Sequence, residues 1–116
     1  MNTDTQVQVN SKSYTLYDDN GHWLGQVVLT DDGMFASVTD YGNLSYAWRA
    51  YGSNGDFRKF MLSINTGYFA TKLYTGMAYI CHTKAVEKAC GRFAEKILPA
   101  LQKVLKEELT NQKPNQ

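Results

Sequence analysis

The 116-residue chain has few of the residues that would tie it to secretion, to a membrane or to a disulfide scaffold. It contains two cysteines, Cys81 and Cys90, which are too few for a disulfide framework. Its first ten residues, MNTDTQVQVN, lack the basic and apolar segments of a secretion signal. No apolar run reaches the roughly 20 residues that cross a bilayer. We therefore expect a cytoplasmic protein without membrane contact, in which both thiols are buried and inert.

The chain also lacks a strong catalytic or cofactor-binding motif. No Ser or Cys stands in a G-x-S-x-G elbow, and the glycine-rich stretch GSNGD lacks the lysine of a phosphate loop. His82 and the two cysteines are the nearest group to a metal site, but the second ligand pair of a structural zinc site is missing. Buried thiols beside a histidine at a helix start explain these residues without a metal. We therefore expect no enzymatic activity, no metal and no cofactor.

Charge is divided unevenly along the chain. Through residue 56, two basic residues against seven aspartates give −5, and from Phe57 onward ten Lys or Arg against four Glu give +6. Because Asp favours turns and Glu favours helices, this division predicts strands first and helices second. We expect a single domain over residues 1–116, with an antiparallel sheet at 7–52, a helical half at 56–109 and a disordered tail at 110–116.

Two hairpin signals define the predicted sheet, because Asn20-Gly21 and Asp32-Gly33 are typical of two-residue turns. The first turn predicts the cross-strand pairs Tyr14–Val27, Leu16–Gly25 and Asp18–Trp23. The second predicts the pairs Val27–Val38, Leu29–Ala36 and Asp31–Met34. One face, the predicted core, then holds Tyr14, Leu16, Trp23, Val27, Leu29, Met34, Ala36 and Val38. The opposite, mixed face holds Tyr17, His22, Leu24, Gln26, Val28, Thr30, Phe35, Ser37 and Thr39.

The stretch TDYGNLSYAWRAYG continues the sheet into a fourth strand. A two-residue turn at Gly42-Asn43 would place Trp48 on the mixed face, whereas a three-residue loop at residues 41–43 places it in the core. The second choice buries the large rings and is the one we expect. It pairs Val38 with Tyr46 and Ala36 with Trp48. Arg49 and Tyr51 are then left to face the other way.

The second half of the sequence predicts two or three helices packed on one face of the sheet. The expected architecture is therefore an α+β fold with a four-stranded antiparallel meander. A cap at residues 53–56 precedes a helix over FRKFMLSIN, and YFATKLYT forms a second helix that Gly76 ends. MAYIC, at residues 77–81, fits either a strand or a helix entry. From about Thr83 the last helix follows one apolar stripe, made of Val86, Cys90, Phe93, Ile97, Leu101 and Val104 and widened by Ala89, Ala94, Leu98 and Leu105.

Three surfaces are candidate partner sites, each with a plain structural explanation beside it. The first is the mixed sheet face with its neighbours, namely Tyr17, Leu24, Val28, Phe35, Arg49 and Tyr51, unless another segment covers it. The second is the set of acidic turns, Asp18, Asp19, Asp31 and Asp32, which turn chemistry alone also explains. The third is a basic row on the last helix, Lys84, Lys88, Arg92 and Lys96, which is equally typical of a solvated helix face.

The segments LGQVVLTDDGMFASVTDYGNLSYAWRAYG and ACGRFAEKILPAL resemble small proteins encoded by phages and prophages of Gram-negative bacteria. The resemblance covers nearly the whole chain and carries over no catalytic residue. It implies a class of small proteins that bind and block a host protein in the bacterial cytoplasm, of which anti-CRISPR and other anti-defence inhibitors are examples. A host nuclease or a CRISPR-associated complex is then the expected partner, with the acidic turns imitating nucleic-acid phosphates or the basic helix docking on an acidic surface.

Two other functions stay open at this point. One is a nucleic-acid-binding module that uses the basic last helix with Arg49 and Tyr51, although the near-neutral net charge makes it the weaker alternative. The other is a self-assembling structural phage component, for which a homodimer is the simplest form.

Overall fold

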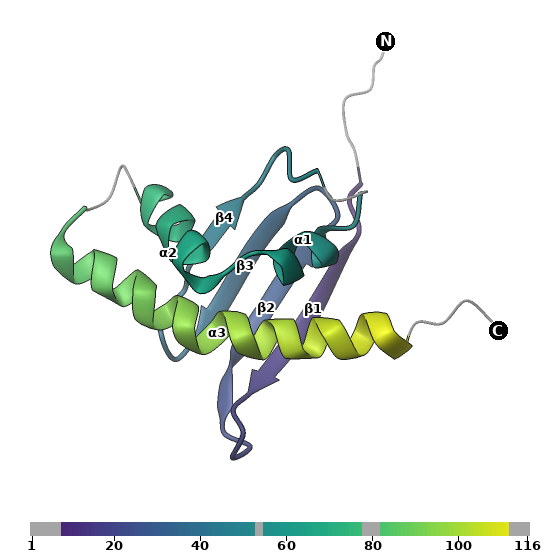
Figure 1. Cartoon of the computed structure of the whole chain (residues 1–116), viewed down its shortest axis with the longest axis horizontal. Coiled ribbons are helices and arrows are strands. Elements are labelled where there is room, and N and C mark those ends of the chain that lie inside the picture. The colour runs from purple at the N-terminus through teal and green to yellow at the C-terminus, as the bar shows by residue number, and fades with distance from the viewer. Residues whose placement is uncertain (1–7, 53–54, 78–81, 112–116) are drawn as a thin grey trace, which may run out of the picture.

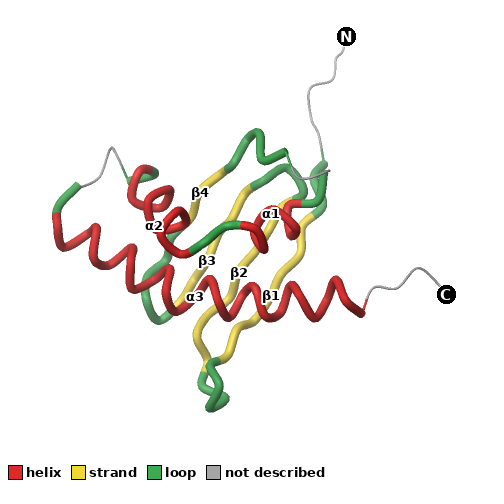
Figure 2. Tube along the Cα trace, in the orientation of Figure 1, coloured by secondary structure: helices red, strands yellow, loops and turns green. Residues whose placement is uncertain are grey.

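Four antiparallel strands form one sheet in the order β1-β2-β3-β4, and three helices follow them in the chain (Figure 1). The computed structural model describes residues 8–52, 55–77 and 82–111. The strands are β1 (Ser11–Tyr17), β2 (Trp23–Thr30), β3 (Met34–Thr39) and β4 (Ser45–Ala47). The helices are α1 (Phe57–Ser63), α2 (Thr66–Thr75) and α3 (Lys84–Asn111). Figure 2 shows the helices lying over one face of the sheet, so the predicted α+β meander with helices on one face is confirmed.

The first hairpin has a three-residue loop, not the predicted two-residue turn. The backbone N–H of Gly21 donates to the Asp18 carbonyl (3.0 Å), and the N–H of Asp18 donates to the His22 carbonyl (2.9 Å). Gly21 takes the left-handed conformation that closes such a loop, with φ at 83°. The pairs Tyr14–Val27 and Leu16–Gly25 are as predicted, but Tyr17 pairs with Trp23 where Asp18 was expected.

The change of register near this loop makes a β-bulge, in which Leu24 is the residue left without a partner on β1. A bulge turns the extra side chain out of the usual alternation. Leu24, predicted for the mixed face, is therefore buried in the core, with 6% of its surface exposed. Trp23, predicted for the core, shares the outer face with Tyr17.

The second hairpin also has a three-residue loop, and here the difference moves a whole strand. The Gly33 N–H donates to the Thr30 carbonyl (3.2 Å), and the register pairs Leu29 with Phe35. This is one residue away from the predicted pairing, and a slip of one residue exchanges the two faces of a strand. Phe35 is fully buried, whereas Met34 and Val38 are 40% and 57% exposed. The predicted assignment of Met34, Ala36 and Val38 to the core, and of Phe35 to the mixed face, is therefore wrong.

Loop chemistry explains why three residues are preferred at this turn. A two-residue primed turn would place both Asp32 and Gly33 at positive φ, whereas the three-residue loop needs only Gly33 there, at φ 102°. The Thr30 hydroxyl donates to the Asp32 carboxylate and accepts the Met34 backbone N–H (3.0 Å), so a side chain before the loop and one within it stabilise the loop.

The third turn lies at Asp40 and Tyr41, where Gly42 N–H donates to the Thr39 carbonyl (3.3 Å), and not at residues 41–43. β4 therefore pairs Tyr46 with Phe35, and the predicted partner Val38 is wrong. The predicted pairing is wrong by an odd number of residues both between β2 and β3 and between β3 and β4. Each odd error exchanges the two faces, so the two exchanges cancel and β4 keeps its predicted face. Trp48 is 6% exposed and Tyr46 packs against the core, which confirms that both rings belong to it.

Beyond β4 the chain turns toward the helices. The Tyr51 ring lies 5.1 Å from Phe57 and 5.9 Å from Phe60 between centroids, and its hydroxyl donates to the Asp31 carbonyl (2.8 Å). The prediction that Tyr51 faces away from the core is therefore wrong, because the ring joins the aromatic cluster of α1. Arg49, in the same segment, is exposed.

α1 begins after its predicted cap and ends at Ser63, two residues before the predicted end. α2 begins at Thr66, two residues before the predicted start at Tyr68, because Asn65 caps it. The Asp56 carboxylate accepts the Arg58 N–H (3.0 Å) at the start of α1, the Asn65 side chain accepts the Tyr68 N–H (2.8 Å) at the start of α2, and Gly76 ends α2. Residues 78–81, most of the ambiguous MAYIC stretch, lie outside the described residues, and so do residues 112–116 of the expected tail. α3 continues to Asn111, two residues into that tail.

The core is a single cluster between the sheet and the helices, and Trp48 joins its strands to its helices. The Trp48 indole lies within 6.2 Å of the rings of Tyr46, Phe57, Phe60 and Phe69. Its N–H donates to the Tyr68 hydroxyl (3.1 Å), so the polar end of this buried ring has a partner. α3 contributes the largest buried set, namely Cys90, Phe93, Ala94, Ile97, Leu98, Leu101 and Leu105.

One polar cluster fastens α1, α3 and β1 together. The Arg58 guanidinium contacts the Asp56 carboxylate at 3.0 Å and the Glu108 carboxylate at 3.2 Å, and the Tyr14 hydroxyl donates to Glu108 (2.7 Å). The side-chain hydrogen bond from Arg58 lowers the pKa of Asp56. Burial, followed by the bond to Glu108, raises the pKa of Tyr14. The cluster thus links three elements that are far apart in the sequence.

Asp56→Asn should therefore change the acid limb of the stability profile. A carboxyl whose pKa is lowered by folding stabilises the fold above its unfolded pKa, near 3.8, and this contribution is lost as the pH falls through the lower folded value. Asparagine keeps the cap but not the charge. At neutral pH we expect the variant to lose about 2 kcal/mol of unfolding free energy, and below about pH 4 we expect its stability to approach that of the original chain. Urea denaturation between pH 2 and 7 measures this.

Asp19→Asn is the matched control, because Asp19 is exposed and its distance to the Lys103 ammonium is 3.9 Å. Its effect should stay within about 0.5 kcal/mol. Parallel pH profiles for Asp56→Asn and the original chain would contradict the role given to the Arg58 cluster.

Candidate functional site

The face of the sheet turned away from the helices is built of uncharged side chains. The cross-strand pairs place thirteen residues on it, which we call the open face: Ser11, Ser13, Thr15, Tyr17, Trp23, Gln26, Val28, Thr30, Met34, Ala36, Val38, Ser45 and Ala47. None carries a formal charge, and all are exposed or half-buried in the described part of the chain. The outer face of a solvated antiparallel sheet is normally polar. Six of the thirteen residues are Ser, Thr or Gln, but the other seven are apolar or aromatic.

Apolar and aromatic residues occupy the middle and both ends of the open face. Val28 and Ala36 pair at its centre, Tyr17 and Trp23 pair near the first hairpin, and Met34 lies at the opposite end. Tyr17 is 56% exposed, and Trp23 is 40% exposed. Enrichment in Tyr, Trp and Met with depletion of charge is the composition of the central part of protein interfaces.

The open face contains only two of the six residues predicted for the sheet surface, namely Tyr17 and Val28. Leu24 and Phe35 are in the core, Tyr51 packs on α1, and Arg49 follows β4 without pairing to a strand. The residues that the predicted register missed are Trp23, Met34, Ala36 and Val38. The sequence contains one signal that could have placed these residues correctly. Each of the first two hairpin loops has a glycine at its third position, and a glycine there suits a three-residue loop as well as a two-residue turn.

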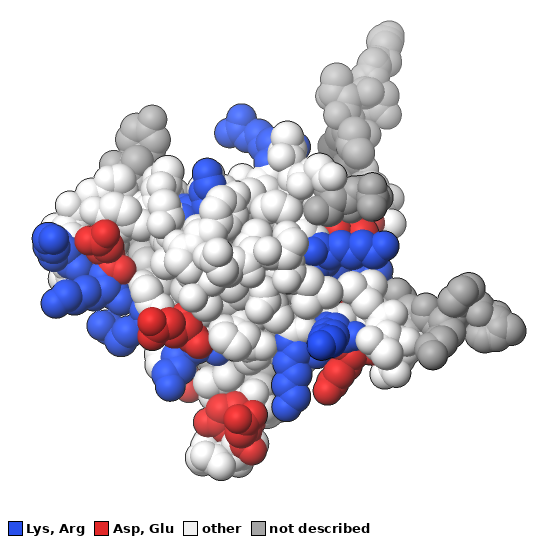
Figure 3. Space-filling view, in the orientation of Figure 1, with Lys and Arg blue, Asp and Glu red and all other residues white. Residues whose placement is uncertain are grey.

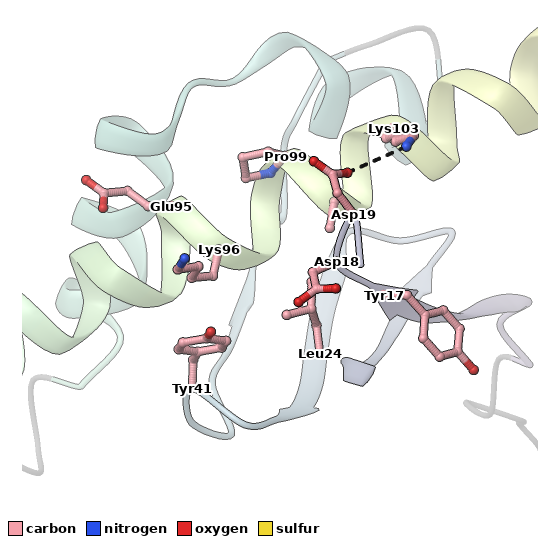
Figure 4. Close-up of a pocket in the computed structure, with 10 residues that line it drawn as sticks. Tyr17, Asp18, Asp19, Leu24, Tyr41, Glu95, Lys96, Pro99 and Lys103 are labelled. Atoms are coloured by element: carbon pink, nitrogen blue, oxygen red, sulfur yellow. Dashed lines mark ion pairs between the residues drawn. The ribbon is translucent and has the colours of Figure 1, made fainter. Parts of the chain in front are cut away.

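A cleft of about 300 Å³ adjoins the open face where the first hairpin and the β3–β4 turn approach the middle of α3 (Figure 4). It brings together members of all three predicted surfaces: Tyr17, Leu24, Asp18, Asp19 and Lys96. Figure 4 shows the Tyr17 ring pointing away from the other labelled side chains, so this residue joins the cleft to the open face. Acidic and basic side chains both line the cleft, so its lining has mixed charge and does not favour a ligand of either sign.

The acidic turns are held by their own hairpins and do not form one acidic surface. The Asp18 carboxylate accepts the N–H groups of Asn20 (2.8 Å) and His22 (2.9 Å), and the bond from His22 lowers its pKa. Asp31 and Asp32 lie in the next loop of the meander, which is at the opposite end of β2. The four aspartates predicted as one kind of site are thus separated by the length of the sheet.

The basic row is exposed as predicted. Lys84, Lys88, Arg92 and Lys96 all lie on the solvent side of α3, and Figure 3 shows Lys and Arg side chains along this helix. The first three are not among the residues that line the cleft.

The residues considered for a metal have other roles in the structure. Cys90 is buried in the core, where burial raises the pKa of its thiol. The His82 ring stacks on Tyr74 at 4.3 Å between centroids, and its Nε2 lies 2.8 Å from the Tyr74 carbonyl. Cys81 lies outside the described residues. Within the described ranges, no three His, Cys, Asp or Glu side chains are grouped to hold a metal ion, and no helix is long and apolar enough to cross a membrane.

Residues 5–87 match the family model Phage_phiTE_072, which is described as a phage family. The match spans well over half of the chain and includes the whole sheet with its open face, α1 and α2. No curated protein and no solved structure matches the chain.

Two neighbouring residues of β3 test which side of the sheet is open. Phe35→Ala should cost about 3–5 kcal/mol of unfolding free energy, because it leaves a cavity in the core. Met34→Ala should stay within about 0.5 kcal/mol, because Met34 lies on the open face. Thermal or urea denaturation of the two variants measures the difference. A larger loss for Met34→Ala than for Phe35→Ala would show that the predicted register, and not the described one, is correct.

Proposed function

The chain belongs to this phage family, and from that premise we propose that it is a non-enzymatic phage protein that binds a host protein through the open face and thereby inhibits or redirects it. The observation that carries the proposal is the absence of charge from thirteen surface residues that include Tyr17, Trp23, Met34 and Val38. Exposed apolar and aromatic side chains grouped on one face often mark an interaction site. An anti-defence inhibitor, such as an anti-CRISPR protein, is the class we propose for it.

The open face also limits the chemistry of the partner. A charge buried against it would find no opposite charge, and an unpaired buried charge costs several kcal/mol. The partner surface should therefore be uncharged where it meets the centre of the sheet, at Val28 and Ala36. Apolar or hydroxyl-bearing side chains fit this requirement.

The interface should extend beyond the sheet at the first hairpin. A standard interface takes about 20–30 residues from each partner, which is more than the thirteen of the open face. Tyr17 belongs to both the open face and the cleft, so the adjoining charged residues Asp18, Asp19 and Lys103 are placed to form a polar rim. An uncharged centre with a charged rim is the usual arrangement in protein complexes.

Val38→Glu tests this proposal, because Val38 is 57% exposed on the open face and a charge there leaves the core untouched. Immobilised protein is incubated with bacterial lysate, and captured proteins are identified by mass spectrometry. We expect a defined host protein to be captured by the original chain and lost with Val38→Glu, because the new carboxylate would be buried without a partner.

Thr71→Glu is the matched control, since it adds the same charge at an exposed position of α2. It should retain the captured protein. Equal capture by both variants, or no specific capture by the original chain, would contradict the proposal. The remaining alternative is self-association through the open face, and light scattering of the purified chain tests it. A dimer that Val38→Glu dissociates would show that the open face binds a second copy instead of a host protein.

A further inference from the structure

α3 carries a row of basic side chains along its solvent side, which we call the basic ridge and which has a gap between Lys96 and Lys103. Its members are Lys84, Lys88, Arg92, Lys96, Lys103 and Lys106, and all six are exposed. Between Lys84 and Lys106 the other exposed residues of α3 are Ala85, Glu87, Glu95 and Pro99. Six basic residues against two acidic ones give this side of the helix a local charge of +4. The net charge of +1 for the whole chain hides this separation.

The charges of the ridge are largely free to meet a ligand. Lys84, Lys88, Arg92 and Lys96 make no ion pair with any residue in the described part of the chain. Lys103 lies 3.9 Å from the Asp19 carboxylate, but both side chains are mostly exposed, and such a pair contributes little. The basic residues that stabilise the fold are elsewhere, as Arg58 is in its cluster with Asp56 and Glu108.

The composition of the ridge fits a phosphate backbone better than a protein surface. Its exposed side has no aromatic residue and no large apolar residue, whereas a protein interface has an apolar centre. Single-stranded nucleic acid is usually held by aromatic side chains on which its bases stack, and the ridge offers none. Rows of Lys and Arg without such rings bind the regularly spaced phosphates of a duplex.

The length of the ridge agrees with this ligand. Lys106 lies 22 residues after Lys84, which corresponds to a rise of about 33 Å at 1.5 Å per residue. This is close to one helical turn of duplex DNA, which is about 34 Å. Laid along the duplex axis, α3 therefore spans about one turn, and its basic side chains meet the phosphates of both strands where they pass under the helix.

We propose that the basic ridge binds the sugar-phosphate backbone of double-stranded nucleic acid without reading its sequence. The ridge lies on the helical side of the molecule and the open face on the opposite side of the sheet, so both surfaces can be occupied together. The chain would then hold a protein partner next to a duplex. Binding to the duplex does not depend on the proposed function, because it needs no partner protein.

Fluorescence anisotropy with labelled duplexes of about 20 base pairs, two helical turns, measures this binding. The full chain is titrated into duplex DNA, duplex RNA and single-stranded DNA at several salt concentrations. We expect both duplexes to bind more tightly than the single strand, with an affinity that falls steeply as salt is added. The triple variant Lys84→Gln, Lys88→Gln, Arg92→Gln should bind at least about tenfold more weakly and lower the double-logarithmic salt slope by about 2 to 3.

A matched control is available on the rest of the surface. Lys12, Arg49 and Lys59 are exposed and lie off α3, and their change to Gln removes the same two lysines and one arginine. The control triple variant should bind the duplexes as the original chain does. Circular dichroism of both triple variants verifies that they are folded, as expected for exposed positions.

Three outcomes would overturn the proposal. A flat titration with every probe would show that the ridge is only a solvated helix face. Equal loss of binding in both triple variants would show a dependence on net charge alone. Stronger binding to poly-glutamate than to either duplex would assign the ridge to an acidic protein.

Discussion

The turn at Gly33 is the constraint on which the rest of the structure depends. Gly33 adopts a left-handed φ of 102°, its carbonyl accepts the Trp48 N–H at 2.8 Å, and its Cα packs so closely on the Trp48 backbone that a Cβ would meet the Trp48 carbonyl oxygen. This turn closes a three-residue loop and so sets the register of β3 against β2. It also holds the end of β4 in place. Phe35 and Trp48 enter the core together because both are fixed through the same residue.

The same register creates the two surfaces to which functions are assigned. With Phe35 inside, Ala36 and Val38 are turned to the side that no helix covers in the described ranges, and they join Val28 in a face without charge. The helices bury their apolar stripes on the other side, which leaves the solvent side of α3 to its lysines and arginine. An uncharged sheet on one side and a basic helix on the other are the basis of the two binding functions proposed for this small phage protein.

The sequence predicts the fold class and the approximate helix positions well, because the cap at Asp56 and the apolar stripe of α3 are strong local signals. It predicts the open face poorly. Asp32-Gly33 is compatible with loops of two or three residues, and one residue decides whether Phe35 or Met34 is buried. Phe35 is buried because its ring packs against Phe69 and Phe93 of the helices. These contacts exist only in the tertiary structure, so local sequence patterns do not reveal which face of β3 is buried. The basic row of α3 was found because its spacing lies within one helix.

Nuclear Overhauser effects between the strands test the central claim most directly, since they report which residues lie opposite each other across β2 and β3. The three-residue loop closed by Gly33 predicts cross-strand contacts of Val28 with Ala36 and of Leu29 with Phe35. A two-residue turn at Asp32-Gly33 would instead bring Leu29 opposite Ala36 and Val27 opposite Val38. Observation of that second set would bury Ala36 and Val38, remove the open face and contradict the account.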